Sequence, residues 1–428
     1  MKFSNNPADI DKDLRDAIIT DLKINAQQQL QNVSGILVTG DIAYSGTTHE
    51  YGIAKEYLNE ISNIFSIKPN DIYCVPGNHD INQTTIKESH IIYKEQCEIY
   101  DCLNIDDADK AFNKSVTDSH FNTVLFESIR EYNEFANQFN CNISPEKITW
   151  NNDFELDHGL KLKIYGINSC FLSNKDDHQK DQPDRLMYIG QFQIPPYVPD
   201  TAVLLLCHHP PECWRFKDDI VQKINKRADI QLYGHMHDQS ITLTENNVHL
   251  FSGAAHPSRI TNWKPRYNWL TINSCISNGN RCLEIEIYPR ILSENRNNFI
   301  SDIANCTNGN SIHHFINLDN KRKQDLEDGD IVINQNEENI KIMENYIDVQ
   351  ESILHTDINF KINERDLIYH FYNLSVVRQM ELFNKLELIL EADKTKSISS
   401  LLNDIIERSK QQNKLYLLWD ELTKLREI

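Results

Sequence analysis

Four short polar motifs carry side chains that can bind metals or transfer protons. They are Gly40-Asp41, Gly77-Asn78-His79-Asp80, His208-His209-Pro210 and Gly234-His235-Met236-His237. Together they offer carboxylates, an amide and several imidazoles. This ligand set is typical of Zn, Mn or Fe, and not of Ca or of a structural zinc held by thiolates. The residue types therefore predict a transition-metal site.

Each motif taken alone also has a simpler structural interpretation. A Gly-Asp pair after a strand is usually a turn, an Asn-His-Asp run can cap a helix, and a His-His-Pro run can end a strand. Their joint occurrence, each directly after an apolar run, favours one shared site. Loops at strand ends are where α/β folds assemble sites from distant parts of the sequence.

The elements that must position these motifs alternate between strand and helix, which predicts an α/β layered fold. Apolar runs predict strands at 33–39, 71–75, 162–167, 202–207, 229–233, 248–252 and 282–288. The last two are expected to form an antiparallel sheet with residues 269–272. Helices are expected over 10–31, 49–65 and most of 85–155. In the last of these, a core stripe is expected from Phe121, Leu125, Ile129, Tyr132 and Phe139.

The motifs and their order resemble the calcineurin-like metallophosphoesterase superfamily over roughly residues 1–290. The resemblance implies a two-sheet β-sandwich flanked by helices, with two divalent metals (Mn, Fe or Zn) at the strand ends. Such a pair can clamp a phosphoryl group and activate water. Implied roles are a bridging ligand for both metals at Asp41, ligands of one metal at Asn78, His208 and His235, and a ligand of the other at His237. His79 is implied to be the catalytic histidine and Asp80 its orienting partner, whereas His209 is expected beside the ligands.

One family feature is missing from the sequence. The family begins with an Asp-x-His motif that ends its first strand and binds one metal, and here Lys2 would fall near the position of that histidine. Either the chain starts downstream of the natural beginning, so that residues 1–290 form an incomplete domain, or it is a degenerate member. One metal site keeps four expected ligands, and the other keeps only Asp41 and His237.

Length and composition narrow the class of protein. A chain of 428 residues predicts more than one domain. The formal net charge of −20 argues against non-specific binding to DNA or to anionic membranes. The N-terminus lacks the basic and apolar stretches of a signal peptide, and the ten cysteines form no Cys-x-x-Cys pair. A cytoplasmic protein without a membrane partner is expected.

The C-terminal part differs in composition from the rest. Residues 291–345 are rich in Asn, Asp, Glu and Ser and predict a polar linker, and residues 346–428 predict a small all-α domain. The latter resembles the bacterial effector-associated, death-like adaptor domains in Asp366-Leu367-Ile368-Tyr369, in Leu374-Ser375, and from Ile406-Glu407-Arg408 to Trp419-Asp420. The resemblance implies homotypic docking to a protein partner, as in bacterial antiphage systems.

The sequence as a whole favours a metal-dependent phosphoesterase recruited through its C-terminal domain. A phosphodiester of a nucleotide or nucleic acid is the first expected substrate. A catalytically degenerate scaffold or binding module is the alternative from a different class, because the first motif is missing. A protein phosphatase also stays open, since the acidic composition does not exclude it.

Overall fold

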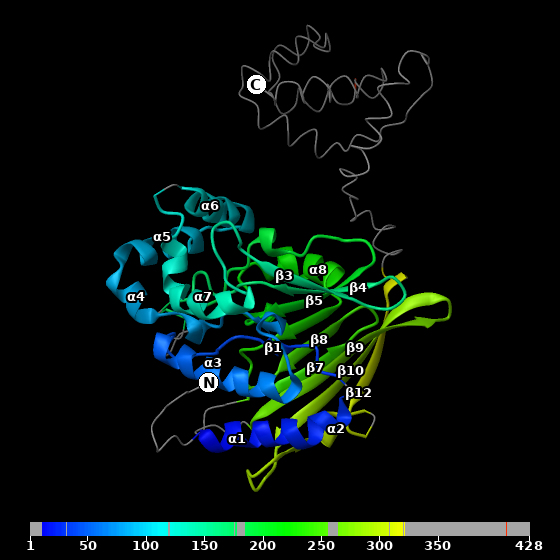
Figure 1. Cartoon of the computed structure of the whole chain (residues 1–428). Helices are drawn as coiled ribbons and strands as arrows, with labels where there is room; N and C mark the ends of the chain where they lie inside the picture. Colours follow the sequence, from blue (N-terminus) through cyan, green and yellow to red (C-terminus); the bar gives the residue numbers. More distant parts are fainter. Residues whose placement is uncertain are drawn as a thin grey trace, which may run out of the picture. The chain divides into compact units, whose positions relative to one another are not determined.

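The structure is a computed structural model that describes residues 11–30, 32–118, 120–174, 176–177, 185–255, 264–307, 309–319, 321 and 408. The chain divides into two compact units, residues 1–333 and 334–428. All helices and strands with described bounds belong to the first unit (Figure 1).

A six-stranded mixed sheet carries two of the four motifs. Its order is β3-β4-β5-β6-β8-β7, with parallel pairing from β4 to β8 and antiparallel edge strands. The strands are β3 (Trp150–Glu155), β4 (Lys161–Gly166), β5 (Thr201–Cys207), β6 (Ile230–Tyr233), β7 (Gln239–Leu243) and β8 (Val248–Ser252). Every residue of β5 is buried. Its unbroken apolar sequence fits a central parallel strand covered on both faces.

A second sheet is built on a long antiparallel hairpin. Strands β9 (Arg266–Ser277) and β10 (Asn280–Leu292) pair along their length, and β10 also pairs with β11 (Phe299–Ser301) and β12 (Ile312–Asn317). Leu283, Ile285 and Ile287 alternate along β10 and are fully buried. This period of two places one face of β10 in the core.

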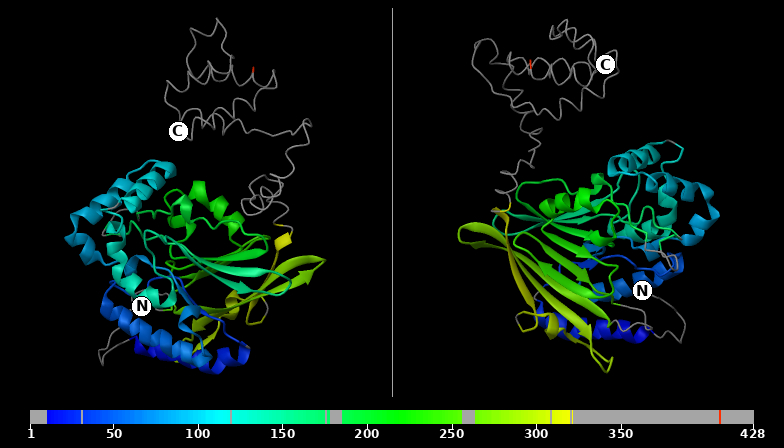
Figure 2. Two further views of the ribbon diagram at one scale, coloured as in Figure 1. Left: turned by 45° about the horizontal axis from the view of Figure 1, so that its top comes forward. Right: turned by 180° about the vertical axis from the view of Figure 1, so that it is seen from behind.

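The two sheets pack face to face and are flanked by helices. The main core contains inward side chains of β4, β5, β6 and β8 together with those of β10 and β12, and in both views of Figure 2 these two groups of strands lie alongside each other. Helix α8 (Lys217–Arg227) covers the other face of β5 and β6. Helix α1 (Lys12–Asp21), continued by a π-helical turn and α2 (Gln27–Gln29), packs on β9, β10 and β11. This agrees with the expected α/β fold.

A separate parallel pair of strands carries the other two motifs. β1 (Ile36–Val38) pairs with β2 (Ile72–Cys74), and α3 (Thr48–Phe65) connects them. Helix α3 begins with a capping box, in which the Thr47 hydroxyl accepts a hydrogen bond from the Glu50 backbone N–H and the Glu50 carboxylate accepts one from the Thr47 N–H. All residues of β2 are buried, whereas those of β1 are half-buried.

The region after β2 is mostly helical, as expected. Its helices are α4 (Gln83–Glu88), α5 (His90–Tyr100), α6 (Ile105–Thr117) and α7 (Arg130–Ala136), with a 3-10 segment at Val124–Ile129. They gather on one side of the first unit (Figure 1). Four of the five expected stripe residues are buried, but Phe121 is 43% exposed. Its place in the stripe was wrong because the chain turns before the 3-10 segment and breaks the helical period.

Two expectations about the strands are corrected. Residues 248–252 form β8 and belong to the six-stranded sheet, so they do not pair with 282–288. The polar linker does not begin at 291, because β11 and β12 pair with β10 beyond that point. β12 contains polar side chains and β11 has only three residues, so neither gives a clear strand signal. The expected linker beyond residue 319, apart from Lys321, and nearly all of the expected all-α domain lie outside the described residues.

Candidate metal centre

All four motifs lie at strand ends in the structure. Asp41 follows β1, Asn78 follows β2 at the start of a 3-10 turn, His208 follows β5 directly, and His235 follows β6. Two of these residues, Asp41 and His235, have left-handed backbone conformations with φ of 53° and 58°. Such angles are uncommon in residues other than glycine and often occur at functional sites.

His208 lies at the centre of this group. Its Nδ1 donates a hydrogen bond to the Thr39 carbonyl oxygen at 2.8 Å, so Nδ1 carries the proton. Its Nε2 lies 3.1 Å from Asn78 Oδ1 and 3.4 Å from Asp41 Oδ1. In the neutral ring Nε2 is an acceptor, and the two oxygens are acceptors as well. When the ring is neutral, a metal ion can take the position among these three atoms that a proton takes when the ring is protonated. A backbone carbonyl on the far nitrogen is the usual support of a metal-binding histidine.

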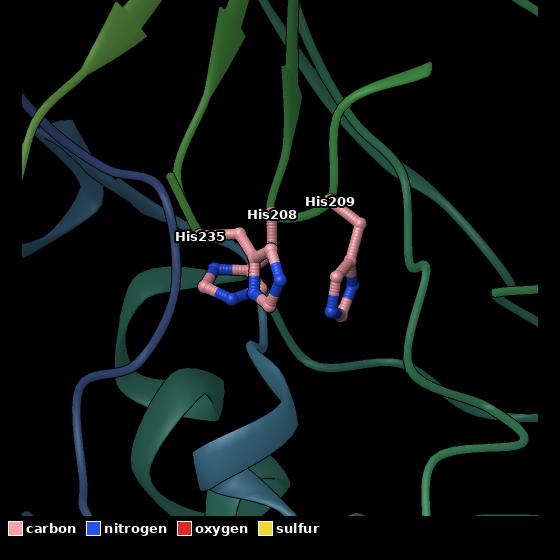
Figure 3. Close-up of side chains that lie close together, drawn as sticks. All are labelled: His208, His209 and His235. Carbon is pink, nitrogen blue, oxygen red and sulfur yellow. The ribbon is translucent and has the colours of Figure 1, made fainter. Parts of the chain in front are cut away.

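The imidazoles of His208, His209 and His235 lie close together (Figure 3). His208, His209 and His235 each offer a ring nitrogen, and these atoms lie within 4.8 Å of one another, close enough to hold a metal ion. The His235 ring lies 4.4 Å from that of His209 and 5.3 Å from that of His208, between ring centroids. His209 is fully buried, and its Nδ1 lies 2.8 Å from the Ser169 hydroxyl. The cluster of three histidine nitrogens therefore includes His209, which was expected to lie beside the metal ligands and not among them.

Close backbone approach at the centre requires glycine. Gly40 has φ of 94°, and a Cβ there would lie 2.6 Å from His208 Nδ1 and 2.8 Å from the Gly77 nitrogen. A Cβ at Gly77 would collide with the Asp41 carboxylate. The glycines before Asp41 and Asn78 therefore let β1, β2 and His208 meet without a side chain between them.

Electrostatics favour the ligand forms of Asp41 and His237. Burial raises the pKa of the Asp41 carboxyl, whereas the nearby His208 and His79 rings lower it. The lowering effects together are larger, so the pKa of Asp41 lies below its usual range. Burial lowers the pKa of half-buried His237, although Asp41 acts in the opposite direction. A carboxylate and a neutral imidazole are the forms that bind metals. These mutual influences also place His237 near Asp41, His79 and His208.

His79 is held at the edge of this group. Its Nδ1 donates a hydrogen bond to the Tyr44 carbonyl oxygen at 3.0 Å, and its ring stacks on that of Tyr44 with centroids 5.1 Å apart. The side chain is half-buried. With Nδ1 engaged by the protein, Nε2 is the nitrogen that can serve a substrate.

Asp80 does not orient His79, contrary to the expectation. The buried Asp80 carboxylate accepts hydrogen bonds from the backbone N–H groups of Ile42, Ala43 and Gly77 and from the Tyr51 hydroxyl, at 2.7–3.1 Å. Both of its oxygens are engaged in this way. Asp80 therefore ties the turn after Asp41 to the turn that carries Asn78 and His79, and its effect on the site is indirect.

We expect Asp80→Asn to destabilise the fold by about 1.5–3 kcal/mol, the range for a hydrogen bond to a charged group. The amide nitrogen of Asn would face N–H donors and lose their bonds. Urea denaturation measures the change. Glu155→Gln is the control, because that side chain is 77% exposed in a surface ion pair and should change stability by less than about 1 kcal/mol. Equal stability of Asp80→Asn and wild type would contradict the bracing role.

Several supporting residues were not predicted from the sequence. Thr39 engages His208 through its carbonyl oxygen, Ser169 engages His209, and Tyr51 engages Asp80. Tyr44 engages His79 through both its carbonyl and its ring. None of them belongs to a spaced motif, so no pattern in a single sequence singles them out. Tyr44 and Thr39 lie within a few residues of Asp41, and this closeness in sequence is the only feature that could have suggested a role for them.

The chain is similar to two known families and to a curated relative. The sequence matches the calcineurin-like phosphoesterase family over residues 11–239 and the GTPase-associated adaptor domain over residues 363–424. It is 27% identical over 236 residues to the uncharacterized metallophosphoesterase-like protein YydB of Bacillus subtilis (strain 168), which covers 51% of this chain and 45% of that relative. The match thus spans less than half the length of the curated relative.

The fold has weak similarity to solved structures. A Vps29 double mutant from Entamoeba histolytica aligns with 74% of this chain and 95% of its own, at 10% identity and a TM-score of 0.24. GAP50 of Plasmodium, described as the anchor in the inner membrane complex, aligns with 74% of this chain and 87% of its own, at 10% identity and a TM-score of 0.32. In the part of the chain that the structure describes, no helix is both long and apolar enough to cross a membrane.

The family match covers more than half of the chain and includes all four motifs in full. The chain therefore belongs to the calcineurin-like phosphoesterase family and carries a C-terminal GTPase-associated adaptor domain.

Proposed function

We propose that the chain is a metal-dependent phosphodiesterase recruited to its place of action through the C-terminal adaptor domain. The observation that supports this most directly is the convergence of three potential ligand atoms, in which His208 Nε2 lies 3.1 Å from Asn78 Oδ1 and 3.4 Å from Asp41 Oδ1. With a neutral His208 ring all three atoms are acceptors, and a metal cation can be held by all of them. The family membership supports a phosphate ester as the substrate.

The residues divide into ligands and a proton donor. Asp41, Asn78, His208 and His235 would hold one divalent ion, and Asp41 and His237 would contribute to a second. A bound metal of this kind neutralises charge on the phosphoryl group and activates water. His79, fixed through Nδ1 at the rim, would donate a proton from Nε2 to the leaving oxygen. Asp80 and the two glycines keep these groups in position.

The adaptor domain supports a role for a protein partner. A domain that docks on a matching domain brings the phosphoesterase to a complex, so the partner would determine where the enzyme acts. The two compact units of the chain are consistent with separate tasks for catalysis and recruitment. An antiphage role belongs to this proposal as one setting in which such recruitment operates.

A catalytically silent scaffold is the second candidate, and one observation favours it. Among the predicted ligands, only Asp41 and His237 are assigned to the second ion, and two ligands hold a metal weakly. A chain that keeps one ion firmly and the other loosely would retain the fold and lose most of the rate. Metal stoichiometry and hydrolysis, measured together, separate the two candidates.

We expect the full chain to bind one Mn²⁺ firmly and a second weakly, and to hydrolyse bis-p-nitrophenyl phosphate slowly and only with metal. His208→Ala should weaken the firm site by more than the roughly 10–100-fold that loss of an outer-shell partner costs, because it removes a ligand. Calorimetric titration with Mn²⁺ gives both affinities, and absorbance of released p-nitrophenolate gives the rate.

His120→Ala is the matched control, since this imidazole is 84% exposed and lies outside the four motifs. It should bind metal as the wild type does. Firm metal binding without hydrolysis of any phosphodiester would favour the scaffold. Equal Mn²⁺ affinity in His208→Ala and His120→Ala would overturn the proposed ligand set.

A further inference from the structure

An exposed aromatic ring stands at the edge of the proposed catalytic centre. Tyr44 lies three residues after Asp41, and 47% of it is exposed to solvent. Its ring lies nearly parallel to the His79 imidazole, with an interplanar angle of 16° and centroids 5.1 Å apart. One part of the ring therefore covers the proposed proton donor, and much of the rest faces solvent.

The backbone of this residue is fixed from both sides. The Tyr44 N–H donates to Glu50 Oε1 at 3.3 Å, the Ser45 N–H donates to Glu50 Oε2 at 3.2 Å, and the Tyr44 carbonyl accepts from His79 Nδ1 at 3.0 Å. Glu50 is itself held in the capping box of α3. The exposed ring is thus attached to a braced turn, and a group that binds it meets a surface that is already in place.

The position of the ring indicates what it would meet. The His79 backbone N–H donates to Asp41 Oδ1 at 3.1 Å. Given the proposed role of His79 as proton donor, a phosphate held among Asp41, His208 and His235 would present its leaving group to His79, and so to the ring stacked on it. Nucleic acid bases stack on aromatic side chains, which stabilises them by roughly 1–3 kcal/mol per base. An aliphatic leaving group would gain much less from the same face.

We propose that Tyr44 is a specificity-determining residue that stacks on a nucleobase in the leaving part of a nucleotide-sized phosphodiester. This inference rests on the proposed phosphodiesterase function and narrows its substrate class. The formal net charge of −20 repels a long polyanion, whereas a substrate with one or two phosphates meets little of that repulsion. A mononucleotide or dinucleotide ester therefore fits better than duplex nucleic acid.

The test compares two phosphate monoesters that differ only in the base-bearing group. Adenosine 5′-monophosphate and methyl phosphate are titrated into the Mn²⁺-loaded full chain by calorimetry, and their affinities are expressed as a ratio. The wild type should bind the adenosine ester about tenfold more tightly. Tyr44→Leu should bring the ratio close to one, and Tyr44→Phe, which keeps the ring, should leave it within about twofold of the wild-type value.

Phe315→Leu is the matched control, because this aromatic side chain is 46% exposed but lies on β12. It should leave the ratio unchanged. An unchanged ratio in Tyr44→Leu, with both affinities reduced equally, would mean that Tyr44 only positions His79 and would overturn the proposal. A wild-type ratio near one, or no binding of either ester, would overturn it as well. Hydrolysis of bis-p-nitrophenyl phosphate, followed in parallel, tests the phosphodiesterase function separately.

Discussion

His79→Asn should lower the turnover of a phosphodiester by about 10²–10⁴-fold, the range for loss of a general acid, while leaving the firmly bound metal in place. Asparagine can still donate a hydrogen bond toward the Tyr44 carbonyl, but it cannot deliver a proton to a leaving oxygen. His79 binds through Nδ1 to that carbonyl and is not among the three histidines whose nitrogens gather within 4.8 Å. Its loss should therefore separate rate from metal affinity.

The choice of substrate sharpens this measurement. p-Nitrophenolate is a weak base and leaves without much help, whereas the alkoxide of a dinucleotide needs a proton in the transition state. The loss in His79→Asn should be larger for the dinucleotide than for bis-p-nitrophenyl phosphate. His120→Asn, at an exposed imidazole, should change neither rate. Loss of the bound Mn²⁺ in His79→Asn would instead identify His79 as a ligand, and the acid role would fail.

Asp21→Ala should destabilise the fold by about 3–5 kcal/mol, because it leaves a buried guanidinium without its counter-charge. Asp21 and Arg290 are 3% and 5% exposed. The carboxylate accepts hydrogen bonds from Arg290 Nε at 2.9 Å, from Arg290 Nη2 and from the Tyr267 hydroxyl. This pair joins helix α1 to β10 and so holds the helix against the second sheet. Equilibrium unfolding in urea measures the loss.

The same helix offers a matched control for Asp21. Asp16 forms an ion pair with Lys12 at 2.7 Å, with side chains 62% and 68% exposed, and Asp16→Ala should change stability by no more than about 0.5 kcal/mol. A double variant, Asp21→Ala with Arg290→Met, should regain much of the lost stability, since it removes the unpaired charge as well. If Asp21→Ala behaves like Asp16→Ala, the buried pair does not hold the helix.

The placement of the four motifs could be predicted from the sequence because each follows an apolar strand. The unbroken run from Ala202 to Cys207 indicates a buried strand without any knowledge of its neighbours, and His208 then lies at its end. A strand without a regular apolar pattern could not be predicted from the sequence. β12 reads Ile-His-His-Phe-Ile-Asn, and its polar side chains hide it inside an apparent linker.

The hydrogen-bond partners of each side chain were the part of the site that the sequence predicted least well. Asp80 follows His79 in the sequence and was expected to serve it, yet its carboxylate is used by backbone groups 37 and 38 residues away and by Tyr51. Which donor a carboxylate meets depends on how two turns pack, and spacing within one motif does not contain that information. For the same reason, no sequence pattern indicated that Tyr44 and Ser169 contact the histidines of the site.

The left-handed backbone at Asp41 and His235 limits the substitutions that these positions tolerate. An L-residue in this conformation is destabilised by roughly 1–2 kcal/mol, a penalty that glycine avoids and asparagine reduces. To remove the carboxylate, Asp41→Asn is therefore a better variant than Asp41→Ala, because alanine would also add backbone strain and so lower stability. A lineage with no use for the metal would gain stability by drifting to glycine at both positions. Under the proposed function, aspartate and histidine at these positions trade stability for metal binding.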